Sequence, residues 1–106
     1  MRAAILIAAL VQTAAINGQR DKFISCLEGA EATAKAQKMA PEALEAHLRQ
    51  TCAAQEASFT ASLIAFDLKN KVARKQAAED AKLQIDDFVS GTVTHYKRTL
   101  TLSQRG

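Results

Sequence analysis

The sequence has no tryptophan, one proline and only four glycines in 106 residues. Long stretches without proline or glycine argue against a turn-rich β protein and favour an all-α fold. Aromatic residues make up only 5% of the chain, and alanine supplies a large share of the hydrophobic residues. Helices with small side chains bury little apolar area per residue, so we expect a thin core in which a covalent link would add useful stability.

The motifs of common enzyme classes are also missing. There is no glycine-rich phosphate loop, no G-x-S-x-G and no H-E-x-x-H. His47 and His95 have no second ligand at metal-binding spacing, and the two cysteines do not form a C-x-x-C pair. We therefore predict a protein that is not an enzyme and that requires no metal or other cofactor.

Charge of one sign is not in large excess. Fourteen lysines and arginines face eleven acidic residues, which gives a formal charge of +3. Basic residues and aromatics do not alternate as they do in nucleic-acid binders, so we predict no nucleic-acid partner. The densest acidic group, Asp86-Asp87 with Glu79-Asp80, lies on diverging helical positions and is interpreted as a solvated face.

The two cysteines flank the one strong turn signal in the chain. Cys26 and Cys52 lie equally far along the sequence on either side of Met39, and Pro41 suits the first position of a second helix. If the chain reverses at Met39-Ala40-Pro41, antiparallel helices carry both cysteines to the same level, so a disulfide becomes possible. The alternative is two unpaired cysteines that fill core positions.

The first fifteen residues have the pattern of a secretory signal peptide. Arg2 precedes a short apolar run from Ala3 to Val11, and small residues stand at the −3 and −1 positions of a cut after Ala15. The run is too short to span a bilayer comfortably. We predict a periplasmic or secreted protein with a domain at residues 16–106; the alternative is a cytosolic chain with an amphipathic or buried first helix.

Apolar residues in the remaining chain recur at helical spacing. The expected fold is a signal peptide followed by a disulfide-linked helical hairpin that a further helix extends to a three-helix bundle. The expected helices cover about 19–39, 41–68 and 72–90, with a stop at Ser90-Gly91 and a tail at 91–106. The expected inward positions are Phe23, Cys26 or Leu27, Ala30, Ala34, Gln37, Leu44, Leu48, Cys52, Phe59, Leu63, Phe66, Ala73, Ala77, Ala81, Ile85 and Phe88.

Two arrangements of residues 41–90 remain open, because no proline or glycine interrupts Glu42 to Ser90. A break within Asp67-Leu68-Lys69-Asn70-Lys71 would let one chain bury all its apolar stripes, and Asn70 suits a helix end. One continuous helix would instead expose Leu63, Phe66, Ile85 and Phe88 unless two chains form a homodimer. We favour the break.

The predicted break is surrounded by a basic group. Lys69, Lys71, Arg74 and Lys75 lie close together in the sequence, and Arg74 or Lys75 can pair with Glu79 at helical spacing. Such a group can attract an acidic partner or lipid headgroups, or it can simply keep the turn soluble. We name it as the candidate interaction surface.

Short motifs in this order resemble small uncharacterised exported helical proteins of Gram-negative bacteria that have two cysteines. The motifs are Phe23-Ile24-Ser25-Cys26-Leu27, Cys52, Ala65-Phe66-Asp67 and Gln84-Ile85-Asp86-Asp87-Phe88, and they follow the leader. The resemblance extends over most of residues 16–106 and implies no activity.

Two functions follow as hypotheses. The first is a non-enzymatic interaction or structural module of the envelope that binds another protein or the membrane surface. The second is a cytosolic helical-hairpin adaptor that dimerises along a long second helix.

Overall fold

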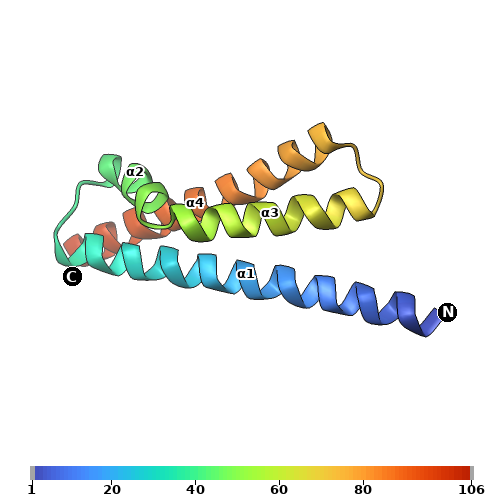
Figure 1. The fold of residues 1–106 in the computed structure, drawn as a ribbon. Coiled ribbons are helices and arrows are strands. Elements are labelled where there is room, and N and C mark those ends of the chain that lie inside the picture. Colours follow the sequence, from blue (N-terminus) through green and yellow to red (C-terminus); the bar gives the residue numbers. More distant parts are fainter. Residues whose placement is uncertain (1, 106) are drawn as a thin grey trace.

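The computed structural model describes the backbone of residues 2–105 and the side chains of residues 14–103. The described chain forms helices and short turns, as the all-α prediction requires, and contains no strand in that range. The helices, labelled in Figure 1, are α1 (Arg2–Ala36), α2 (Pro41–Thr51), α3 (Ala53–Lys69) and α4 (Arg74–Arg105).

The helices form an elongated bundle of about 60 × 26 × 22 Å. Helices α1 and α3 lie side by side, and α4 packs against α1, α2 and α3. The turn between α3 and α4 lies at the same end of the molecule as the N-terminus, whereas the turn between α1 and α2 lies at the other end with the C-terminus (Figure 1). The predicted hairpin is therefore present, and α4 packs against it as the expected third helix; the described chain has four helices because the predicted second helix is divided in two.

Helix α1 is continuous from Arg2 to Ala36. The predicted start at residue 19 is wrong for the backbone, since Asn17 and Gly18 lie within the helix and Asp21 does not cap it. One glycine in a helix costs only about 1 kcal/mol relative to alanine, which neighbouring contacts can offset. The predicted signal peptide falls mainly on residues 1–13, whose side chains lie outside the described part of the chain.

The predicted reversal near Met39 is present. Helix α1 ends at Ala36 instead of residue 39, because Lys38 takes a left-handed conformation with φ 56°. The Met39 amide donates to the Ala34 carbonyl at 2.9 Å. Ala40 is extended and Pro41 occupies the first turn of α2, as its fixed φ favours.

A break at Cys52 divides the predicted helix 41–68 into α2 and α3, which corrects that prediction. Cys52 has φ −104° and ψ 21°, outside the helical region. Its amide still donates to the Leu48 carbonyl, and its own carbonyl accepts from the Glu56 amide, both at 2.9 Å. The disulfide holds this residue against α1, and the change of direction lets α2 pack on both α1 and α4.

The break predicted within residues 67–71 is confirmed. Helix α3 ends at Lys69, and the Asn70 side-chain amide donates to the Phe66 carbonyl at 2.9 Å. Lys71, not Asn70, takes the left-handed conformation, with φ 65°. The Val72 amide then donates to the Asp67 carbonyl at 2.9 Å, so the end of α3 is closed by hydrogen bonds before α4 begins.

The stop predicted at Ser90-Gly91 is wrong, because α4 continues to Arg105. Gly91 is exposed, and a Cβ atom there would meet nothing within 4 Å, so no close contact requires a glycine. Beyond it, Tyr96 is completely buried, and its hydroxyl donates to the Met39 carbonyl at 2.6 Å. This packing stabilises the helical form of the predicted tail.

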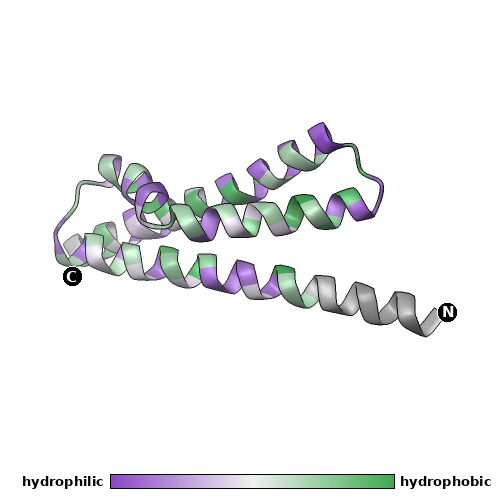
Figure 2. Ribbon diagram, in the orientation of Figure 1, coloured by the Kyte–Doolittle hydropathy of each residue, from purple (hydrophilic) through white to green (hydrophobic). Residues whose placement is uncertain are grey.

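The core combines residues from all four helices. Rings of Phe23, Phe59 and Phe88 come from α1, α3 and α4, and their centroids are 6.0–6.2 Å apart, within the range of favourable aromatic pairs. Apolar and polar residues alternate along the helices in Figure 2, as expected for amphipathic helices around one core. The buried residues are Phe23, Leu27, Ala30, Ala34, Leu44, Leu48, Cys52, Phe59, Leu63, Ala77, Ala81, Ile85, Val89 and Tyr96.

Most predicted core positions are thus confirmed, with a few exceptions. Gln37 and Ala73 are exposed, because each lies at a helix end next to a turn. Phe66 is only half-buried and lies near the end of α3. Phe88 is half-buried too, but its ring packs in the aromatic cluster.

Candidate functional site

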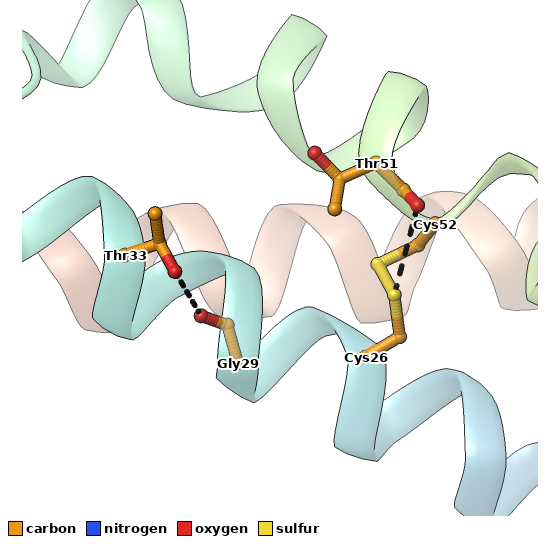
Figure 3. The surroundings of a disulfide bond; sticks show 5 residues. All are labelled: Cys26, Gly29, Thr33, Thr51 and Cys52. Atoms are coloured by element: carbon orange, nitrogen blue, oxygen red, sulfur yellow. Dashed lines mark hydrogen bonds between the residues drawn. A yellow bond between two sulfur atoms is a disulfide. The ribbon is translucent and has the colours of Figure 1, made fainter.

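The disulfide between Cys26 and Cys52 is present and joins α1 to the break between α2 and α3 (Figure 3). Their Cα atoms are 5.8 Å apart, a usual separation for a disulfide. Cys52 is fully buried and Cys26 is half-buried, with its sulfur 3.9 Å from the Thr51 carbonyl oxygen. The alternative of two unpaired core cysteines is therefore wrong.

Gly29 and Thr33 lie one and two turns beyond Cys26 on α1. The Thr33 hydroxyl donates to the Gly29 carbonyl at 3.1 Å (Figure 3). A Cβ atom at Gly29 would meet nothing within 4 Å, so no partner helix approaches it closely. Among the residues drawn around the disulfide, no nucleophile and base lie side by side.

The basic group surrounds the α3–α4 turn. Lys69 ends α3, Lys71 lies in the turn, and Arg74 and Lys75 begin α4, with all four side chains exposed. Among residues 14–103, none of the four takes part in an ion pair, and the expected partner Glu79 is not paired with Arg74 or Lys75. The structure thus places the predicted residues together on one exposed turn.

The sequence did not reveal a charged network around Arg49, and the prediction of a solvated face included Asp86, which belongs to this network. The Arg49 guanidinium donates to Asp86 at 2.8 Å and to Glu56 at 3.1 Å, and lies 3.6 Å from Glu45. Lys82 also pairs with Asp86, at 3.0 Å. Because these carboxylates come from α2, α3 and α4, Arg49 links three helices across the break at Cys52.

The hydrogen bond from Arg49, followed by that from Lys82, lowers the pKa of Asp86. The same bond to Asp86 raises the pKa of Arg49 and keeps the guanidinium charged. A carboxylate whose pKa is lower in the folded state stabilises the fold above its unfolded pKa of about 3.9, and this contribution disappears as the pH falls through the folded pKa.

We therefore expect Asp86→Asn to lower the urea midpoint at neutral pH, with a difference from the unmodified protein that shrinks as the pH falls below about 4. Asp87→Asn is the matched control. The Asp87 carboxylate is next to Asp86 in the sequence, but it is exposed and makes no ion pair among the described side chains. Urea unfolding across pH checks both variants. Equal losses for the two variants at neutral pH would show that the Arg49 network does not stabilise the bundle.

A second interhelical contact joins α4 to α1. His95 Nδ1 lies 2.7 Å from a Glu31 carboxylate oxygen, at one side of an open groove of about 440 Å³ between the two helices. Glu28 and Asp87 also line this groove. Within the described residues, no three histidine, cysteine or acidic side chains are arranged to hold a metal ion.

A larger open groove, of about 520 Å³, lies between α3 and α4 and has mainly apolar walls. Ala57, Ala61 and Ile64 of α3 face Ala78 and Ile85 of α4 across it. Arg49, Glu56, Lys82 and Asp86 of the charged network line it as well. His47 lies on α2 and lines neither groove.

Comparison of the chain with protein-family models, with curated proteins and with solved structures finds no match. None of the helices in the described part of the chain has the length and hydrophobicity needed to cross a membrane. The features of the chain that bear on its function are the disulfide, the arrangement of charges and the N-terminal sequence.

Proposed function

We propose that this chain is a non-enzymatic interaction module exported to the periplasm or secreted. The observation that carries the proposal is the disulfide between Cys26 and Cys52. Disulfides form and persist in oxidising compartments and are rare in the cytosol, where thiols are kept reduced. A small domain with an alanine-rich core also gains a large share of its stability from such a bond.

The N-terminal sequence supports the same compartment. A positive residue, a short apolar run and small residues before Ile16 make up the pattern of a cleavable leader. Every buried residue of the described core lies at Phe23 or later, so loss of residues 1–15 would leave that core in place. Ile16 packs at its edge, and the first residue of the mature chain would still contact the bundle.

The close polar contacts of the described part of the chain support a binding role over catalysis. Arg49, His95 and Tyr96 each use their polar atoms to join one helix to another element. Long exposed helix faces and the basic turn remain for a partner. A module of this kind works by presenting a rigid surface, and the disulfide and the interhelical contacts supply that rigidity.

The cytosolic adaptor is the less favoured function. It required a continuous second helix whose apolar stripe is free to meet another copy of the chain. Helices α2 and α3 break at Cys52, and Phe59 and Leu63 are buried within the single chain. No second chain is needed to cover these two residues.

The intact mass of the protein from its native host tests the proposal. Export predicts a chain that lacks residues 1–15 and whose cysteines react with an alkylating reagent only after reduction. A full-length chain with two free thiols would overturn it and restore the cytosolic adaptor.

A further inference from the structure

The basic turn and the leader lie at the same end of the molecule, a relation that the sequence alone does not show. Lys69 lines a small pocket together with Ala15 and Ile16 of α1 and Phe66 of α3. Lys69 is therefore level with the predicted cleavage site. The turn that follows it lies at the end of the bundle where α1 begins (Figure 1).

The apolar run of the leader ends four residues before Ala15, which corresponds to about 6 Å along a helix. Before cleavage, a leader held in a bilayer would bring the basic turn to the level of the lipid headgroups, and the four basic side chains, which are exposed, remain available in the mature chain. Lysine and arginine suit that level, because their apolar stems lie along the interface while their charged ends reach the phosphates.

We propose that the α3–α4 turn docks on an anionic phospholipid membrane surface through Lys69, Lys71, Arg74 and Lys75. This inference rests on the proposed function, because it names the envelope partner of the exported module. The turn is a projecting, exposed end of the bundle, a shape that fits a flat membrane better than a narrow binding cleft.

The local charges support an anionic partner. From Leu68 to Ala78 the chain has these four cations and no acidic residue. Arg74 and Lys75 stand in the first turn of α4, which contains no acidic residue, although the helix dipole disfavours positive charge at that end. A bound layer of phosphates would remove this local repulsion.

The opposite end of the molecule provides a matched control with four other exposed cations, Lys35, Lys38, Lys97 and Arg98. This end differs in its surroundings, because Lys97 shares a small pocket with Glu42 and Glu45. Replacing either set by glutamine removes the same number of positive charges. Comparing the two variants therefore distinguishes an effect of where the charges lie from an effect of the total charge.

The test is co-sedimentation of the oxidised protein from its host with vesicles of phosphatidylglycerol and phosphatidylethanolamine, compared with phosphatidylcholine vesicles. Each basic residue at an anionic surface is worth about 1 kcal/mol, or about fivefold, so we expect at least a tenfold preference for the anionic vesicles. Added salt should reduce this preference, because it screens exposed charges.

The variant with Lys69→Gln, Lys71→Gln, Arg74→Gln and Lys75→Gln should lose the preference, and the variant with the other four cations replaced should keep it within about threefold. Thermal unfolding confirms that both variants fold. Equal losses for the two variants, or no preference in the unmodified protein, would overturn the proposal; the latter would point to an acidic protein as the partner. An oxidised mature protein that ignores vesicles would still leave the exported module standing.

Discussion

Replacing Cys26 or Cys52 by alanine should lower the melting temperature by about 15–25 °C. The disulfide closes a loop over a sequence separation of 26. Such a loop contributes about 3.5 kcal/mol in the chain-entropy model, and 1 kcal/mol corresponds to about 4–8 °C in a domain of this size. Alanine is chosen because a serine hydroxyl at the fully buried Cys52 would add its own penalty.

The double variant should be as stable as either single variant, because each single change already removes the bond. A reducing agent should lower the melting temperature of the unmodified protein by a similar amount and leave the variants unchanged. Thermal unfolding followed by circular dichroism measures all four proteins. Losses that simply add in the double variant would show that the two cysteines do not stabilise the fold as a pair.

Phe59→Ala should destabilise the fold by about 3–5 kcal/mol, the usual cost of removing a buried phenylalanine. Phe59 is fully buried and touches the rings of Phe23 and Phe88, so its loss opens a cavity where three helices meet. Since small domains have a free energy of unfolding of about 5–15 kcal/mol, this substitution would remove much of it. Urea unfolding measures the change as a shift in midpoint.

Phe66→Ala is the matched control on the same helix. The sequence pattern places Phe66 on the same stripe as Phe59, but the structure leaves it half-buried near the end of α3. It should therefore cost clearly less than Phe59→Ala. Equal costs would show that the end of α3 is covered more completely than this packing indicates.

Local signals in the sequence were sufficient for two of the turns and for the cysteine pairing. Pro41 favours the first turn of a helix with an extended residue before it, and the Asn70 side chain can accept the role of a helix cap by bonding to the end of α3. Once the turn near Met39 is known, equal spacing brings Cys26 and Cys52 level. Each of these inferences needs only neighbouring residues and the rise of a helix.

The features that were missed depend on contacts between distant residues. Gly91 is a reasonable stop signal on local grounds, yet α4 continues because Tyr96 is anchored to a carbonyl 57 residues away. No proline or glycine lies next to Cys52 in the sequence to indicate a break in the helix. The Arg49 network likewise became visible only with α4 in place, since Asp86 lies 37 residues away.

The candidate interaction surface was likewise predictable from the sequence only in part. The four basic residues are close in the sequence, so their clustering was predictable from the sequence alone. Their position beside the predicted cleavage site required the packing of α3 on α1, which brings Lys69 next to Ala15. That relation is the basis for the proposal that the basic turn docks on a membrane.

The most direct test of an exported, disulfide-linked module is the intact mass of the protein from its native host, measured after alkylation with and without prior reduction. We predict a chain that begins at Ile16 and takes up no alkyl group before reduction and two after it. The Cys26→Ala and Cys52→Ala variants, each with one thiol, calibrate the mass added by alkylation. A chain that retains its first fifteen residues and takes up two alkyl groups without reduction would contradict both the compartment and the disulfide.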